Sequence, residues 1–525
     1  MKCKSLLAAA LLCLSMATAA AAPPPAQPTV QAPPEVAERE PSLDERIDAV
    51  VRPVADTVSR AIFSSVRVGG PDEAPVRFPL IVAWLILGGL VTTFYFRFIN
   101  IRGFRHGLDL IRGKYADPNS AGEVSHFQAL TSAVSGTVGL GNIAGVAVAI
   151  TIGGPGATFW MILAGLLGMS TKFAECSLGV IYRLEKPDGT VSGGPMYYLR
   201  RGIAENYPRL AAVGMILAVV VALCTMAGAI GAGAMFQANQ AYSQLANVSG
   251  SLLEGRGWLF GLVYATLAGL VVVGGISRIG VVTAKLVPGM ALIYIIGALG
   301  VIALNLPQLP GAFMTILDGA FTAQGVQGGV IGALIQGFRR AAFSNEAGLG
   351  SAPIAHAAVR TREPMTEGFV ALWEPFIDTV VICTMTALVI IITNQHAVGG
   401  ADGVELTSNA FATVGAWTPY LLTVVVLLFA FSTTITWGYY GAKAASFLAK
   451  ESRTVLYGFK FFYLAMVVVG CTMNLGSIVD LADGLMFIMA IPNLIGVYLL
   501  LPVLKRKLAD YQARLASGEI RPSGG

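Results

Sequence analysis

Long apolar segments alternate with short polar connections along the chain from residue 78 onward. A helix needs roughly 20 consecutive apolar residues to cross the hydrocarbon core of a bilayer, and about eleven segments meet that length. They run approximately over residues 78–97, 128–151, 155–182, 209–236, 257–276, 281–304, 326–356, 369–394, 418–447, 456–474 and 478–503. The pattern predicts an all-α polytopic membrane protein embedded in a lipid bilayer.

Composition agrees with this interpretation. Of 525 residues, 55% are hydrophobic and only 12% are charged, and the mean hydropathy is +0.69. A soluble domain needs more charge to cover its surface. The net charge of +5 is modest and requires no nucleic-acid partner. The sequence shows no His/Cys cluster at metal-ligand spacing, no phosphate-binding loop and no nucleophile elbow, so we expect neither a cofactor nor an enzyme.

The first 77 residues follow a different pattern. Residues 1–22 carry two lysines, a short apolar run and an Ala-rich end, which predicts a cleaved signal peptide. Residues 23–77 predict a Pro-rich linker and then a short amphipathic helix outside the membrane, starting near a capping box at Ser42 to Glu45. The membrane domain is expected at 78–505 and a tail at 506–525. Four cysteines in apolar segments, Cys176, Cys224, Cys383 and Cys471, predict free buried thiols.

Lys and Arg are distributed unevenly between the connections. They gather after the first, third, fifth, seventh and ninth segments and in the tail, whereas residues 306–325 and 395–417 contain none. Positive residues stay on the cytoplasmic side, so the tail and the basic connections are expected in the cytoplasm. An odd number of spans then places the mature amino terminus outside. A cleaved signal peptide requires the same orientation.

The second segment is interrupted by glycines and polar residues near its middle, where residues 135–145 read SGTVGLGNIAG. A broken membrane helix exposes free carbonyls on one half and free amides on the other, and is tolerated where it lines protein or a polar cavity. Carbonyls suit a cation, and the amide end suits a carboxylate. Thr137 and Asn142 add side-chain oxygens. Close helix packing by small residues is the alternative, in particular for Gly145.

The seventh segment carries the second unusual stretch, QGFRRAAFSNEAGLGSAP at residues 336–353. Arg339, Arg340, Asn345 and Glu346 cannot face lipid together. Glu346 could form a buried, purely structural ion pair with Arg339 or Arg340. Phe343, Ser344 and Asn345 are better placed to line a cavity.

The ninth segment contains adjacent hydroxyls, Ser432, Thr433 and Thr434, followed by Trp437. Such hydroxyls often bond back to helix carbonyls, but beside a broken helix they can complete an oxygen cage for a sodium-sized ion.

Isolated polar residues complete the set. Gln237 and Asn239, at the end of the fourth segment, either reach the cavity or cap the helix. Asp378 is an intramembrane acid and therefore a functional candidate. Glu374 is interpreted as an interface marker, and His356 as a satisfied residue at a helix end.

The two broken segments occupy matching positions. If the first segment is peripheral, segments two to six (about residues 128–304) and seven to eleven (about 326–503) form two sets of five, and each set opens with a discontinuous helix. Five is odd, so the second set has inverted topology. Such a five-plus-five inverted repeat holds substrate and ion midway, where the discontinuous helices meet, and works by rocking one bundle against the rest.

Several motifs resemble the alanine/glycine:cation symporter family of bacteria and archaea, namely residues 131–147, 153–157, 192–198 and 343–352. The resemblance covers roughly residues 78–505. It implies a leucine-transporter-like fold and uptake of a small neutral amino acid, alanine or glycine, with sodium as the co-transported ion, across the inner membrane of a bacterium. Residues 136–142 and 432–434 also look like the ion-site helices of the wider neurotransmitter:sodium symporter group.

The resemblance also implies residue roles. Thr137, Gly141 and Asn142 would hold the carboxylate or an ion, and Gln237, Phe343, Asn345 and Trp437 would line the substrate pocket. Sodium would be surrounded by Gly136, Val138, Ser432, Thr433 and Thr434. Two alternatives remain open, which are proton coupling through Glu346 or Asp378, and an amino-acid-gated channel or sensor on the same fold.

Overall fold

The computed structural model describes residues 52–53, 56–69, 75–115, 120–187, 189–250, 253, 255–322 and 329–522. The expected signal peptide, most of the Pro-rich linker and the capping box at Ser42 lie outside the described residues.

The segment before the first span contains a helical stretch at residues 56–62 and then two paired strands, β1 (Ser65–Gly69) and β2 (Val76–Pro79). The strands are antiparallel, with Val66 opposite Phe78. The helical stretch lies within the region of the expected amphipathic helix, which stays a prediction, whereas the hairpin was not expected. Phe63 connects this segment to the membrane domain, because its ring lies 3.9 Å from the Arg339 guanidinium and 5.6 Å from the Phe487 ring.

Helices dominate the rest of the chain. After the hairpin come α3 (Leu80–Tyr95), α4 (Ile99–Arg102) and α5 (Phe104–Ile111). The first expected repeat contains α6 (His126–Thr137), η2 (Gly141–Gly145), α7 (Val146–Gly153), α8 (Ala157–Ile181), α9 (Pro195–Tyr197), η3 (Tyr198–Gly202), α10 (Ile203–Asn206), η4 (Pro208–Leu210), α11 (Ala211–Gly228), η5 (Ala229–Phe236), α12 (Gln237–Ser249), α13 (Gly257–Val272) and α14 (Gly275–Leu304). Two short strands, β3 (Leu184–Glu185) and β4 (Val191–Ser192), pair between α8 and α9.

The second expected repeat and the segment before it are also helical. They contain η7 (Leu306–Gln308), α15 (Leu309–Phe321), α16 (Gly329–Asn345), α17 (Ala352–His356), α18 (Met365–Ala371), α19 (Trp373–Pro375), η8 (Phe376–Cys383), α20 (Thr384–Ile392), η9 (Gln395–Ala397), α21 (Gly403–Ala412), α22 (Thr418–Leu448), α23 (Arg453–Gly470), α24 (Leu475–Phe487) and α25 (Ala490–Ala516). The 306–325 and 395–417 connections, expected as loops, thus contain the helices α15 and α21.

Seven helices within the described residues are long and apolar enough to cross a membrane, and the bent pair α6 with η2–α7 makes up to eight. The helices α3 and α13 are apolar but shorter, at 16 residues each. The described residues thus confirm an all-α polytopic architecture, and the number of eleven spans stays a prediction.

Some boundaries differ from those expected. The fourth span continues through η5 into α12, as one helical stretch from Pro208 to Ser249. Gln237 therefore lies within a continuous helix and not at its end. The last helix reaches Ala516, so it includes part of the expected tail. The four cysteines of the described residues are free and buried, as predicted.

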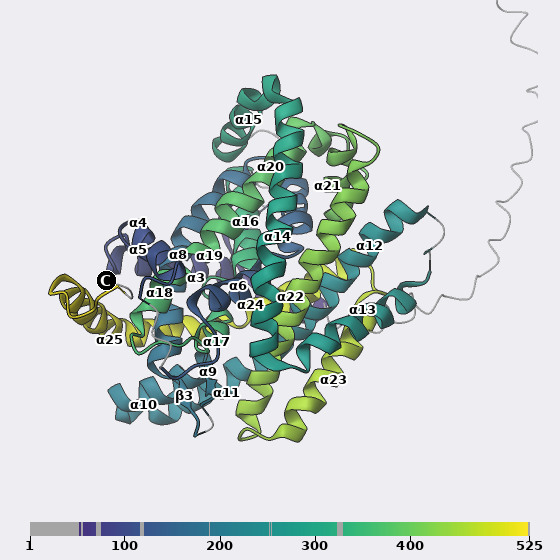
Figure 1. The fold of residues 1–525 in the computed structure, drawn as a ribbon. Helices are drawn as coiled ribbons and strands as arrows, with labels where there is room; N and C mark the ends of the chain where they lie inside the picture. The colour runs from purple at the N-terminus through teal and green to yellow at the C-terminus, as the bar shows by residue number, and fades with distance from the viewer. Residues whose placement is uncertain are drawn as a thin grey trace, which may run out of the picture. The chain divides into compact units, whose positions relative to one another are not determined.

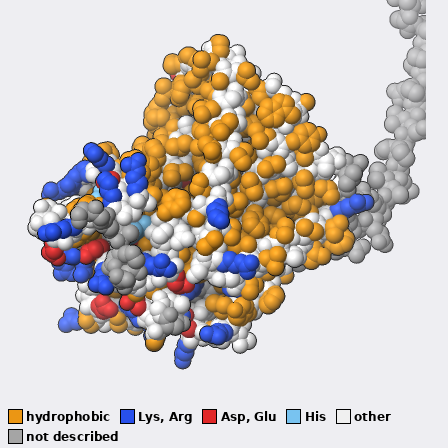
Figure 2. All heavy atoms as spheres, viewed as in Figure 1, with side chains coloured by type: hydrophobic (Ala, Val, Ile, Leu, Met, Phe, Trp, Pro, Cys, Tyr) orange, Lys and Arg blue, Asp and Glu red, His pale blue; other side chains and the backbone are white. Residues whose placement is uncertain are grey.

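The helix α22 lies against α6, α11, α12, α14 and α23, and α8 lies against α16, α3 and α18 (Figure 1). Apolar side chains cover a wide face over α13, α14 and α23, whereas charged side chains gather near α4, α5, α10 and α25 (Figure 2). Exposed apolar residues of these three helices include Leu262, Leu270, Ile296 and Phe461. A continuous apolar face of this kind is expected of a surface in contact with lipid.

Candidate functional site

The first break lies between α6 and η2. Helix α6 ends at Thr137, Val138 has left the helical region with ψ 88°, and the two helical halves are bent by 51°. Side chains replace the lost helical hydrogen bonds. Gly139 N donates to Asn142 Oδ1 at 2.8 Å, and Leu140 N donates to Gln237 Oε1 at 3.0 Å. The predicted discontinuity is therefore present, and Gln237 contacts it directly.

Hydroxyls of α22 meet the carbonyl end of this break. The Ser135 carbonyl accepts from Thr433 Oγ1 at 3.0 Å, and Ser432 Oγ lies 3.4 Å from it while donating to the Phe429 carbonyl of its own helix at 2.9 Å. Ser135 Oγ donates in turn to the Ser432 carbonyl at 2.7 Å and accepts from Thr436 Oγ1 at 3.0 Å. All four side chains are buried. The structure therefore gathers carbonyl and hydroxyl oxygens at the point where the sequence predicts a cation.

Not every predicted ion ligand turns to this point. Thr434 Oγ1 instead lies 3.2 Å from the Tyr264 hydroxyl of α13. Thr137 Oγ1 bonds back to the carbonyls of Ala133 and Val134 at 3.4 and 3.3 Å, so its side chain satisfies its own helix.

Glycines let the neighbouring helices approach the first break. A Cβ on Gly139 would lie 3.0 Å from Gln237 Oε1 and on top of the Thr433 hydroxyl, and one on Gly141 would lie 3.2 Å from Ser344 Cα. A Cβ on Gly145 would meet nothing within 4 Å. The packing explanation is therefore wrong for Gly145.

The second break lies between α16 and α17. It turns sharply through left-handed residues, with φ of 59° at Glu346, 92° at Gly348 and 82° at Gly350. The Glu346 carboxylate accepts from the Ser351 hydroxyl and from Trp437 Nε1, the latter at 2.9 Å. The break thus carries a buried acid that contacts α22.

The expected pairing of Glu346 with Arg339 or Arg340 is wrong. Arg339 donates to Asp483 of α24 at 2.8 Å, and Arg340 also donates to Asp483. The reason is helical geometry. Arg339 and Arg340 lie on the last turns of α16, one or two turns before the break, whereas Glu346 lies past the helix end and turns toward α17 and α22.

Asp378 of η8 joins the two breaks. Its carboxylate accepts from Asn142 Nδ2 at 2.6 Å, from Ser344 Oγ at 2.9 Å and from Thr379 Oγ1 at 2.7 Å, and it is fully buried. Asn142 belongs to the first break and Ser344 to the helix that leads into the second. The sequence singled out Asp378 only as an intramembrane acid, since the spacing along the chain does not show which helices surround it.

The predicted pocket residues lie around this junction and are buried. Asn345 Nδ2 donates to Thr379 Oγ1 at 3.0 Å, and its Oδ1 accepts from Ala347 N at 3.0 Å. The Phe343 ring packs edge-on against Phe236 with a centroid distance of 5.2 Å. Trp437 contacts the second break through Glu346.

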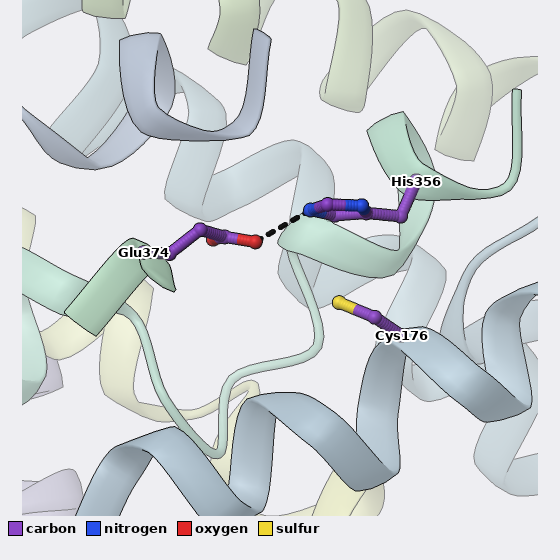
Figure 3. A group of neighbouring side chains, drawn as sticks. All are labelled: Cys176, His356 and Glu374. Carbon is purple, nitrogen blue, oxygen red and sulfur yellow. Dashed lines mark hydrogen bonds and ion pairs between the residues drawn. The ribbon is translucent and has the colours of Figure 1, made fainter. Parts of the chain in front are cut away.

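A further cluster lies on the α17 side of the second break. Cys176, His356 and Glu374 point into one small space, and their ligand atoms lie within 4.8 Å of one another (Figure 3). Glu374 is fully buried, so its interpretation as an interface marker is wrong. Sequence reasoning missed this cluster because its members are almost 200 residues apart and come from α8, α17 and α19.

Known sequences resemble most of the chain. The profile of the sodium:alanine symporter family matches residues 70–523. The sodium/alanine symporter AgcS of Methanococcus maripaludis is 38% identical over 80% of this chain and 92% of its own length. The probable sodium/glutamine symporter GlnT of Bacillus subtilis is 34% identical over 84% and 89%. The putative sodium/proton-dependent alanine carrier protein YrbD of the same organism is 31% identical over 83% and 90%.

A solved structure shares the fold. The crystal structure of MhsT in complex with L-phenylalanine superposes with a TM-score of 0.53 and covers 72% of this chain and 89% of that one. The sequence identity is 13%, so the likeness concerns the fold alone.

Proposed function

The chain belongs to the sodium:alanine symporter family, and on that premise we propose that it couples sodium entry to the uptake of alanine or glycine by alternating access. Membership establishes a multi-pass membrane transporter of amino acids with sodium as the co-transported ion and a leucine-transporter-like fold, and not an enzyme. The choice of amino acid, the residues that bind it and the orientation in the membrane are the proposal.

One observation carries the proposal: oxygen atoms from two separate helices converge on the carbonyl end of a broken helix. Ser432 and Thr433 both reach the Ser135 carbonyl, in a buried setting. Sodium prefers hard oxygen ligands of this kind. We assign the cation to this place, with the carbonyls of Gly136 and Val138 completing the shell and Thr434 turning inward when an ion is bound.

The substrate is assigned to the amide end of the same break. There, the positive end of a helix favours a carboxylate, which would take the Gly139 and Leu140 amides over from Asn142 Oδ1 and Gln237 Oε1. Gly141 and Asn142 lie at this end, with Thr137 before them, and Gln237, Phe343, Asn345 and Trp437 form the surrounding wall. The close approach of Gly141 to Ser344 leaves little room, which favours a small side chain such as a methyl group or hydrogen.

The proposed location is the inner membrane of a bacterium, with the carboxyl terminus in the cytoplasm. This rests on the Lys/Arg asymmetry of the connections and on the predicted signal peptide at residues 1–22. The charged residues near α4, α5, α10 and α25 in Figure 2 lie on one side of the apolar face, which supports that assignment.

Uptake into liposomes with separately imposed gradients tests the proposal. We expect labelled alanine and glycine to accumulate when sodium is higher outside, and not when a pH gradient is imposed without sodium. Accumulation driven by pH alone would instead favour proton coupling, for which Asp378 and Glu346 are the candidate acids. Absence of trans-stimulated exchange of alanine would favour a channel or sensor.

A further inference from the structure

Four buried side chains form a continuous hydrogen-bonded row on the α17 side of the second break. His126 Nδ1 bonds to Glu367 Oε1, Glu367 Oε2 lies 2.5 Å from His356 Nδ1, and His356 Nε2 lies 2.5 Å from Glu374 Oε1. The far oxygen of Glu374 lies 3.1 Å from Lys172 Nζ. These side chains are at most 4% exposed. We call these five residues the histidine row.

The histidine row holds one proton more than two neutral imidazoles and two ionised carboxylates would supply. Its three hydrogen bonds between imidazole and carboxylate need three protons, because an ionised carboxylate only accepts. Two neutral imidazoles provide two. His126 Nε2 is buried without a hydrogen-bond partner, so a second proton on His126 would be left unsatisfied. The extra proton therefore belongs to His356 and its two carboxylates.

Charge balance gives the same count. With His356 as an imidazolium, His356 and Lys172 balance Glu367 and Glu374, and the row is neutral. Without the extra proton, a net negative charge is buried and one imidazole nitrogen presents its lone pair to a carboxylate, which is unfavourable in a low-dielectric interior.

The surroundings do not offer another cation for this role. The other titratable groups that face the row are Glu175 and Cys176 of α8, Glu346 after α16, Asp378 of η8 and Tyr440 of α22. Glu175 accepts from Asn493, and Glu346 from Ser351 and Trp437. These groups are acidic or neutral, so the extra proton is the compensating charge within the described residues.

A metal ion fits the cluster of Figure 3 less well. His356 Nε2 and Glu374 Oε1 are 2.5 Å apart, which is a hydrogen-bond spacing. Two ligand atoms of a tetrahedral Zn²⁺ site, each about 2.0 to 2.1 Å from the ion, lie more than 3 Å apart. Lys172 already places a cation on Glu374.

We propose that the histidine row is a proton-binding site that holds this proton in the conformation described here and releases it when the bundle rearranges during transport. His126 opens α6, which leads to the first break, and His356 ends α17, which follows the second. A rearrangement of the two discontinuous helices would therefore separate His356 from its carboxylates. The proton then leaves the imidazolium for water, and both carboxylates stay ionised. This step rests on the proposed transport function.

Thermal unfolding of the purified full chain tests the proton site without requiring transport. Above about pH 6.5 an unfolded histidine loses its proton while the folded row keeps it, so the stabilisation is fully present below that pH and is lost as pH rises further. We expect the melting temperature to fall by at least about 2 °C more between about pH 6 and pH 9 in the wild type than in His356→Gln. His396→Gln, on a different helix, is the matched control and should follow the wild type. If His356→Gln does not fold, Glu367→Gln serves as the second variant. A fall of equal size in the row variants and the wild type would overturn the proposal.

Release of the proton is measured separately. A pH indicator in weakly buffered detergent solution should report up to one proton released per chain on addition of alanine with sodium, and none from His356→Gln. Sodium and alanine binding without proton release from the wild type would overturn the proposed release and leave the proposed function standing. Stoichiometric Zn²⁺ binding to the wild type that is lost in Cys176→Ser would also overturn the proposal, because the cluster would then be a metal site.

Discussion

The two broken helices differ in how their freed backbone groups are satisfied. At the first break most partners come from other helices. Gln237 of α12 accepts from the Leu140 amide and Thr433 of α22 donates to the Ser135 carbonyl, whereas Asn142 accepts from the Gly139 amide within the break. At the second break more of the partners are local, although Asn493 of α25 donates to the Gly348 carbonyl at 2.8 Å and Trp437 of α22 donates to Glu346. Asn345 caps the Ala347 amide, and Ser351 donates to Glu346 across the turn.

This difference indicates that the first break responds to ligands and that the second break is a fixed part of the site. Hydroxyls and an amide from outside the first break can exchange their hydrogen bonds for an ion or a carboxylate, so that break can respond to ligands. The second break is held by left-handed residues, by its own side chains and by Asn493 of α25, so it is preorganised. Asp378 bonds to Asn142 on one side and Ser344 on the other, which allows a change at the first break to reach the second.

Asn142→Ala should have the largest effect. The substitution removes the acceptor of the Gly139 amide and the donor to Asp378, so both the break and its link to the second helix are lost. We expect sodium-driven alanine uptake to fall about 100-fold, since two buried hydrogen bonds at about 1–3 kcal/mol each are removed. The control is Asn305→Ala, at the end of α14, whose side chain bonds to its own helix. Uptake within twofold of wild type would contradict the role of the first break.

Asp378→Asn should have the next largest effect. The amide keeps the shape but places a donor where Asn142, Ser344 and Thr379 all donate, so one of these bonds must break. We expect uptake to fall about 30-fold, corresponding to about 2 kcal/mol. Ser344→Ala, which removes one donor and leaves the charge, should have a smaller effect. Equal uptake by Asp378→Asn and wild type would mean that the two breaks are not linked through this carboxylate.

Thr433→Ala is expected to act on sodium alone. Loss of the hydroxyl at the carbonyl end should raise the half-saturating sodium concentration about tenfold, or about 1.4 kcal/mol, with little change in the alanine concentration for half-maximal uptake at saturating sodium. Ser446→Ala on the same helix is the control. An unchanged sodium dependence would place the ion elsewhere.

Substitutions of single glycines should have the smallest effects. They distinguish the two breaks by how much each substitution changes the stability of the folded protein. Gly348 has φ 92°, so Gly348→Ala forces a left-handed Ala and should destabilise by about 1 kcal/mol. Gly145 has ordinary helical angles and free space for a Cβ, so Gly145→Ala should be neutral or stabilising by up to about 1 kcal/mol. Melting temperatures in detergent compare the two. Equal destabilisation by both would remove the distinction between a preorganised and a ligand-responsive break.

The position of both breaks could be predicted from the sequence, because a glycine-rich polar stretch inside an apolar segment is tolerated only where it lines protein or a polar cavity. The expected link between the first break and the Ser432–Thr433 pair is likewise present in the structure. The partner of Glu346 could not be predicted. Two arginines lie nearby in sequence, yet the carboxylate lies beyond the end of α16, and Asp483 from a distant helix receives both arginines.

The sequence by itself determined the class of this protein. The length of the apolar segments, their interruptions and the Lys/Arg asymmetry of the connections can all be recognised along the chain without knowing which helices pack together. The junction at Asp378 and the histidine row were decided only by the tertiary structure. Each of these depends on which helices pack together, and a buried polar group acquires its role from partners that can lie hundreds of residues away.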